Sequence, residues 1–172
     1  MMNRIGYEIE KGVIPEYVLQ IASSGVCPQL CKISSFSFGE SYGINYSAEG
    51  MTSFRKMLEA GDKDDFVSIL IYLRAIFESA KGLSDYLIYP QYISFSLDKI
   101  LFDDKKHARF LIKPSESDYV AKVLNLLNEI DCSFPGRNAD LIASRIAEEN
   151  AKQLLSFRQI LSILSAWQME LR

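Results

Sequence analysis

The stretch from Asp65 to Leu87 places apolar residues at intervals of three and four, the spacing of one face of an α-helix. The apolar positions are Phe66, Ile69, Leu70, Leu73, Ile76, Phe77, Ala80 and Leu83. Asp64 and Asp65 are expected to open the helix. A stripe of this length needs a core to cover it, so we expect the helix to lie centrally and the rest of the chain to pack around it.

Strand patterns dominate the residues before this helix. Apolar residues alternate from Arg4 to Glu10, which predicts a first β-strand. Pro15 and Gly25 suit the first turn and the left-handed cap of a helix between them. Alternation resumes from Ile33 to Ser47 on both sides of Gly39, which predicts a β-hairpin with glycine in its turn.

Further elements follow the hairpin. Thr52 is expected to cap a short helix that runs through Ala60 and stops at Gly61. Strand-like runs occupy residues 92–95, 99–103 and 108–112, with a turn at 104–107, and helical patterns occupy 118–130, 139–149 and the residues from Ser156 through Trp167. The second group of strands predicts another hairpin region, and helices close the chain.

The grouping of strands and helices decides the expected fold class. Strand patterns cluster instead of alternating one by one with helices, which favours an α+β fold over a wound parallel sheet. We expect N-terminal antiparallel strands and a hairpin, a long central helix, a second β-hairpin region and C-terminal helices. At 172 residues, one hydrophobic core is the default, so a single domain over residues 1–172 is predicted.

Charge and cysteine content restrict the partners and the compartment. Nineteen Lys and Arg against 22 Asp and Glu give a net charge of −3, without the basic footprint of a nucleic-acid binder. Neither a signal peptide nor an apolar run long enough to span a membrane is evident. Cys27, Cys31 and Cys132 cannot all pair within the chain, so we expect a reducing, cytoplasmic location and no direct membrane insertion.

Candidate chemical groups are few. Cys27 and Cys31 have the spacing of two metal ligands, but a zinc site needs four, so both are expected to be half-buried thiols. His107 lies beside two lysines in a turn, with no evident carboxylate to orient it. Ser53 and Lys56 match the nucleophile tetrad of penicillin-recognising enzymes, whose other motifs are missing. No catalytic, cofactor-binding or metal-binding residue is therefore predicted.

The long helix followed by residues 99–112 resembles the protein-kinase segment that carries the catalytic loop and the Asp-Phe-Gly motif. In that comparison Ser94 stands in place of the catalytic Asp, Lys99 in place of the metal-binding Asn, and Ile112 in place of the Asp of Asp-Phe-Gly. Phosphoryl transfer depends on positioned metal ions and a base, so these substitutions predict a degenerate, truncated kinase-like core without catalysis.

The chain also resembles an uncharacterised bacterial family found N-terminal to forkhead-associated (FHA) domains in Gram-positive proteins. The residues that carry the resemblance are 44–47, 86–90, 99–103 and 109–114, and the helices 139–149 and 157–167. Residues 95–97 depart from it, because the family commonly has an Asp-Pro-Glu-like turn there. The family's kinase-like outline is similar to the cytosolic pseudokinase-like domains of type VII secretion membrane proteins.

These patterns lead to one principal hypothesis and several alternatives. We expect a non-catalytic protein-binding or scaffold domain of a bacterial signalling or cell-envelope system, whose partner is another protein and not a nucleic acid. The main alternative is a nucleotide or small-molecule binding module without turnover. An enzyme of unrecognised type would need His107 as its base. The helix of Trp167 is a candidate surface for homodimerisation, although the sequence does not determine the oligomeric state.

Overall fold

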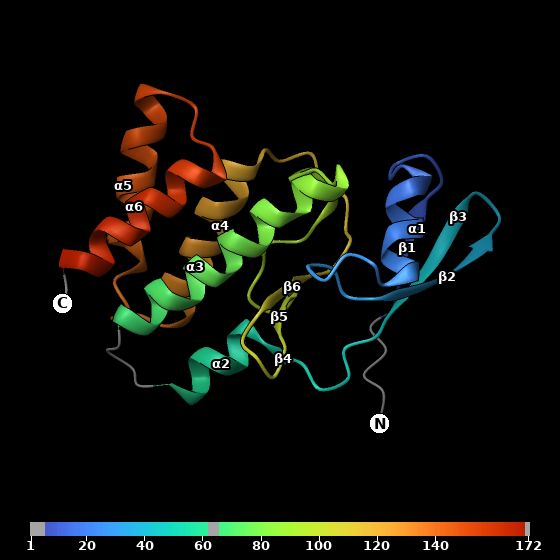
Figure 1. Ribbon diagram of the computed structural model, residues 1–172, viewed down its shortest axis with the longest axis horizontal. Helices are drawn as coiled ribbons and strands as arrows, with labels where there is room; N and C mark the ends of the chain where they lie inside the picture. The colour runs from blue at the N-terminus through green and yellow to red at the C-terminus, as the bar shows by residue number, and fades with distance from the viewer. Residues whose placement is uncertain (1–5, 62–65, 171–172) are drawn as a thin grey trace.

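The computed structural model describes residues 6–61 and 66–170, which form an α+β fold with two three-stranded antiparallel sheets and six α-helices (Figure 1). The elements are β1 (Gly6–Glu10), α1 (Glu16–Ser24), β2 (Ile33–Phe38), β3 (Ser41–Tyr46), β4 (Thr52–Ser53), α2 (Phe54–Ala60), α3 (Phe66–Gly82), the 3-10 helices η1 (Leu83–Tyr86) and η2 (Pro90–Tyr92), β5 (Ile100–Phe102), β6 (Ala108–Phe110), α4 (Tyr119–Ser133), α5 (Ala139–Lys152) and α6 (Phe157–Glu170). The expected fold class is confirmed.

The N-terminal sheet has the strand order β1-β3-β2, with α1 beside it (Figure 1). Ile9 and Ile44 point to the inner face, where both are buried. The predicted hairpin is present, and Gly39 adopts a left-handed φ of 55° in its turn. Gly25 ends α1 in the predicted left-handed conformation. Of the predicted first strand, residues 6–10 are described, and Arg4 lies outside the described residues.

The second sheet has the order β4-β5-β6 and corrects one predicted cap. Ser53, not Thr52, is the N-cap of α2, because its side chain accepts a hydrogen bond from the Lys56 N–H. Thr52 is instead paired with Phe102 of β5. The Phe110 N–H donates to the Gln29 carbonyl (2.8 Å), which attaches this sheet to the segment that links α1 to β2.

The long central helix α3 has the predicted apolar stripe, and six of its residues are buried, but it is shorter than predicted. Asp64 and Asp65 lie outside the described residues. The α-helix ends at Gly82, and η1 continues the chain in a tighter winding. The predicted strand at 92–95 is also wrong. Pro90 begins η2 instead, and Ile93 makes only an isolated bridge to Ile112.

The C-terminal helices complete the core. The side chain of Asp118 caps α4 by accepting the Ala121 N–H (2.8 Å), and Ser156 caps α6 as predicted. Helix α6 packs against α3, and α4 against α5. The ring of Trp167 lies against that of Phe66, with their centroids 6.2 Å apart, so this side chain is partly covered within the chain.

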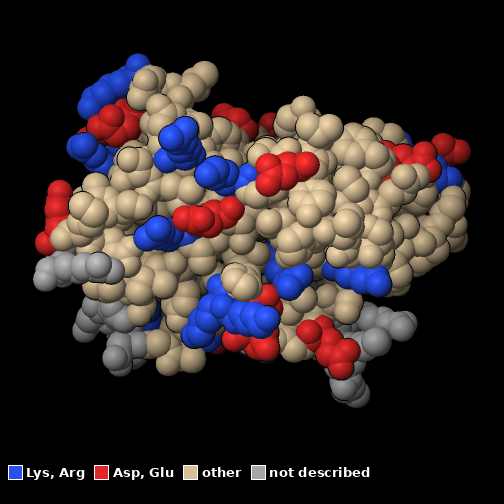
Figure 2. All heavy atoms as spheres, in the orientation of Figure 1, with Lys and Arg blue, Asp and Glu red and all other residues tan. Residues whose placement is uncertain are grey.

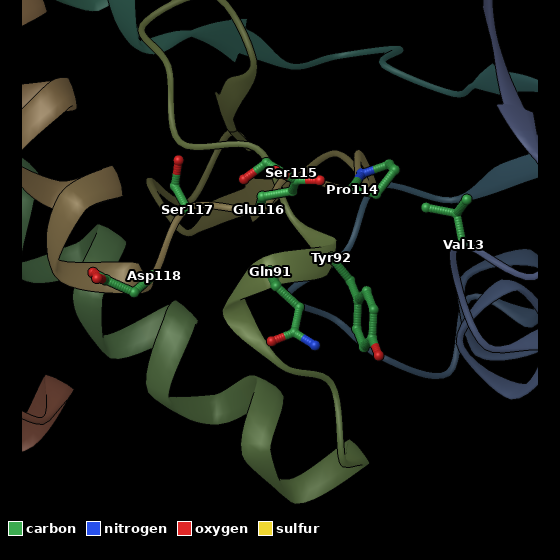
Figure 3. A pocket seen from close by; sticks show the side chains of 8 residues that line it. All are labelled: Val13, Gln91, Tyr92, Pro114, Ser115, Glu116, Ser117 and Asp118. Carbon is green, nitrogen blue, oxygen red and sulfur yellow. The ribbon is translucent and has the colours of Figure 1, made fainter.

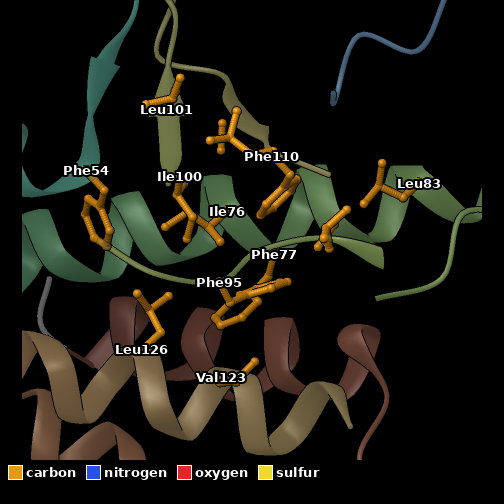
Figure 4. Packing of buried hydrophobic residues seen from close by; sticks show 14 of the residues in the cluster. Phe54, Ile76, Phe77, Leu83, Phe95, Ile100, Leu101, Phe110, Val123 and Leu126 are labelled. Atoms are coloured by element: carbon orange, nitrogen blue, oxygen red, sulfur yellow. The ribbon is translucent and has the colours of Figure 1, made fainter. Parts of the chain in front are cut away.

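The core is one contiguous cluster of buried apolar side chains that extends from Ile9 in β1 to Leu164 in α6. At its centre Phe77 of α3 and Phe95 lie next to Val123 and Leu126 of α4 (Figure 4). The rings of Phe95 and Phe110 are 5.2 Å apart. No helix within residues 6–61 and 66–170 has both the length and the apolar character needed to cross a membrane.

Candidate functional site

The three positions compared with kinase catalytic residues are used for backbone pairing and burial. The Ser94 N–H donates to the Leu111 carbonyl (3.0 Å). Ile112 is fully buried, and its carbonyl accepts the hydroxyl of Tyr46. The Lys99 N–H donates to the Ser96 carbonyl (3.1 Å) within a turn. The side chains at these positions therefore bring no carboxylate to this part of the fold.

A cleft of about 600 Å³ lies between the N-terminal sheet region and the start of α4 (Figure 3). Val13, from the connection between β1 and α1, forms one wall, and Gln91 and Tyr92 of η2 form another. The residues 114–118 that lead into α4 complete it. Its volume is within the range of small-molecule sites. A ligand bound between the N-terminal strands and the C-terminal helices would lie in this cleft.

The charge of this cleft is acidic. Glu116 and Asp118 line it, and no Lys or Arg is among the described residues that do. Lys122 lies one turn into α4, but its Nζ is buried and donates to the carbonyls of Pro90 (2.6 Å) and Ile93 (2.7 Å). Burial lowers the pKa of Lys122 to about 8. A phosphate in the cleft would therefore meet two carboxylates and no available cation.

The cysteines are more buried than predicted. Cys27 and Cys31 are both fully buried, not half-buried. The Cys31 N–H donates to the Phe110 carbonyl of β6 (2.9 Å), which holds this segment against the second sheet. Burial raises the pKa of the Cys31 thiol to about 12, so this thiol is protonated at neutral pH. Cys132 is exposed on α4. Within the described part of the chain, no group of three or more His, Cys, Asp or Glu side chains is placed to hold a metal ion.

His107 does have a carboxylate beside it, contrary to the expectation from sequence. Its Nδ1 lies 3.4 Å from Oδ2 of Asp103, and Nη2 of Arg109 lies 3.1 Å from the same oxygen. Oδ1 of Asp103 accepts the N–H groups of Lys105 and His107, which closes the turn. Burial opposes ionisation of Asp103, but the hydrogen bond from the His107 N–H and the guanidinium of Arg109 together lower its pKa. The carboxylate thus organises the turn between β5 and β6.

The tetrad from Ser53 to Lys56 has a structural explanation. Oγ of Ser53 accepts the Lys56 backbone N–H (3.3 Å), as an N-cap does. Arg55, between them, pairs with Asp98 (2.8 Å) and Glu129 (3.0 Å) and so links α2 to the turn before β5 and to α4. Sequence analysis did not identify this cluster, because its members are separated by 43 and 74 residues.

Aromatic side chains are exposed on the outer face of the N-terminal sheet. Phe36 is 56% exposed and Phe38 is 68% exposed. The ring of Phe36 lies over Gly43 of β3, at the place a Cβ atom would occupy. Together with Gly6 these residues line a shallow hollow of about 390 Å³. We call the surface formed by Phe36, Phe38, Gly43 and Gly6 the aromatic face. Clustered exposed aromatic residues are typical of protein-interaction surfaces.

The outer edge of β2 is open as well. The Ser47 N–H donates to the Lys32 carbonyl, so residues 34, 36 and 38 face β3, and the N–H and C=O groups of Ser35 and Ser37 point away from it. None of these outward groups has a hydrogen-bond partner among the described residues. Over the face seen in Figure 2, acidic and basic side chains are intermixed and form no continuous field of one sign.

Comparisons with known proteins show the fold and not the family. No family model matches the sequence, and no curated protein matches it. Among solved structures, the cytoplasmic fragment of Staphylococcus aureus EssB has a similar fold, with a TM-score of 0.53 and 14% identity. The match covers 97% of this chain and 99% of that chain. The same α+β arrangement therefore extends over nearly all of both chains.

Proposed function

We propose that this chain is a non-catalytic protein-binding or scaffold domain that acts on the cytoplasmic side of a bacterial cell-envelope or signalling assembly. The aromatic face is the observation that carries the proposal. Phe36 and Phe38 remain largely exposed beside an open sheet edge. Removing this surface from water is the main gain that a partner protein would provide.

Two further observations support this assignment. The fold is similar to that of a cytoplasmic fragment of EssB. The FHA-associated family that the sequence resembles has a kinase-like outline similar to the cytosolic pseudokinase-like domains of type VII secretion membrane proteins. A degenerate kinase-like core agrees with the burial of Ile112 at the position compared with a metal-binding Asp. A domain with these properties would hold a partner in place and would not modify it.

Affinity capture from a native lysate tests the proposal. The immobilised chain and a Phe38→Ser variant are compared by quantitative mass spectrometry, with an unrelated immobilised domain as background. We expect at least one protein to be retained by the wild type and depleted at least fivefold on the variant. Retention of nothing above background would overturn the function, whereas equal retention by both baits would move the binding surface elsewhere on the domain.

The cleft favours a second candidate function, small-molecule binding without turnover. Its volume suits such a ligand, but Glu116 and Asp118 disfavour a nucleotide. Thermal unfolding with ATP or GTP, with and without magnesium, shows whether the domain binds a nucleotide. A ligand at one hundred times its Kd would stabilise the fold by about 2.7 kcal/mol. We expect no such shift, and a clear one for either nucleotide would make this candidate the leading function.

A further inference from the structure

A second hollow, which we call the α3–α6 groove, shares no lining residue with the cleft. It is formed where the end of α3 and the segment after η1 meet the start of α6, and its volume is about 530 Å³. Ala80, Ile88, Pro90 and Phe157 contribute apolar surface to its walls. An open groove of this kind is suited to the apolar side chains of another molecule.

The rim of the groove is apolar and held in place. Leu87 and Tyr89 both line it, and they are 66% and 54% exposed. Leu87 has a left-handed φ of 55°, which is unfavourable for a residue with a branched side chain. Its N–H donates to the Ser84 carbonyl (3.0 Å), and its carbonyl accepts the hydroxyl of Tyr17 (2.6 Å). This anchoring orders an exposed apolar rim before any partner arrives.

The charged residues at the groove are cations without counterions. Lys81 of α3 and Arg158 of α6 line it, and neither forms an ion pair with a described residue. No Asp or Glu is among the described lining residues. Asp118, adjacent to the lining residue Tyr119, caps α4 and belongs to the acidic cleft. The cleft is thus lined by acidic residues and the α3–α6 groove by basic ones.

Tyr119 of α4 lines the same groove. Its hydroxyl is buried and has no hydrogen-bond partner among the described residues. Burial raises the pKa of Tyr119, so the hydroxyl stays protonated and able to donate at neutral pH.

From these features we propose that the α3–α6 groove docks an acidic amphipathic segment of a partner protein. Its apolar side chains would cover Leu87 and Tyr89, and its carboxylates would pair with Lys81 and Arg158. Because the two cations come from different helices, they suit an occupant with two or more carboxylates. A fatty acid has only one, so a polypeptide segment is the better fit. The inference rests on the proposed function and specifies which surface and which partner chemistry serve it.

Selection of peptides tests the inference without knowledge of the natural partner. A displayed library of random 16-residue peptides is panned against the full chain, and enriched peptides are measured by fluorescence polarisation. The test variant is Lys81→Glu/Arg158→Glu. The matched control is Lys56→Glu/Lys105→Glu, which makes the same charge change at two exposed lysines outside the groove. Melting curves check that both variants are folded.

We expect the enriched peptides to combine Asp or Glu with large apolar residues. Their affinity should fall at least tenfold on the test variant, change less than twofold on the control, and weaken with added salt. The absence of enriched peptides, or equal binding to the test variant, would overturn the inference. Partner capture from lysate can still succeed in these cases, which separates failure of the groove from failure of the proposed function.

Discussion

Phe36 shows that an exposed side chain can be structural and available for binding at once. It is more than half exposed, yet its ring covers Gly43 on the neighbouring strand and replaces the side chain that Gly43 lacks. Phe38 lies on the same face of the same strand and is still more exposed. Comparing the two residues therefore distinguishes the effect of packing on Gly43 from the effect of an exposed aromatic ring.

Replacing each phenylalanine tests this difference. Phe36→Ala should lower the free energy of unfolding by about 1 kcal/mol, because a cross-strand contact is lost and the backbone at Gly43 is uncovered. Phe38→Ala should change it by less than about 0.5 kcal/mol, as exposed substitutions usually do. Urea denaturation of both variants measures the values. Equal effects would show that Phe36 has no special role in the sheet.

The lowered pKa of buried Lys122 should make the stability of the domain depend on pH. Because its folded-state pKa is about 8 and an ordinary lysine has about 10.4, the unfolded chain binds more protons between these values. The unfolding free energy of the wild type should therefore rise with pH in this window, by at most about 1.4 kcal/mol per pH unit. The unfolding free energy of the wild type minus that of Lys122→Met should therefore rise from pH 7 to pH 9.5.

Denaturation at both pH values with Lys56→Met as the control provides the measurement. Lys56 is exposed, so its substitution should leave a difference that does not change with pH. A constant difference for Lys122→Met as well would show that Lys122 stays charged in the folded state.

At the scale of elements, the start of α4 connects stability to the cleft. Asp118 caps this helix and also lines the cleft, whereas Glu116 lines the cleft without capping a helix. Asp118→Ala should cost about 1 kcal/mol of stability, since the Ala121 N–H loses its acceptor. Glu116→Ala should be nearly neutral. Thermal unfolding of both checks this, and a neutral Asp118→Ala would contradict the assigned cap.

The elements that sequence analysis predicted correctly are those decided by local chemistry. The stripe of α3, the glycine at the end of α1 and the Ser156 cap each depend on neighbouring residues only. The errors arise where pairing with residues far away in the sequence decides the local structure. Thr52 and Ser53 are both acceptable caps, and only the pairing of Thr52 with Phe102, 50 residues away, assigns the cap to Ser53. The chain at 92–95 follows the 3-10 turn begun by Pro90 instead of its strand-like alternation.

On the scale of the whole molecule, the fold class was predictable and the sites were not. The cleft combines Val13 with residues 91–92 and 114–118, and the α3–α6 groove combines Lys81 with Arg158. No sequence motif joins such distant positions. The pairing of His107 with Asp103 was missed for a different reason. The two residues are neighbours in sequence, but only the conformation of the turn between β5 and β6 brings their side chains together. The single domain and the kinase-like outline stay predictions.

The central claim is that the exposed apolar surfaces of this domain contact a partner protein. Photo-crosslinking in the native cell tests it most directly, with benzoylphenylalanine placed at Phe38 or Tyr89, and at Lys105 as an exposed control. We predict a discrete adduct of higher mass from at least one of the two aromatic positions and none from the control. Absence of an adduct at both positions, or the same products at all three, would contradict the proposed protein-binding function.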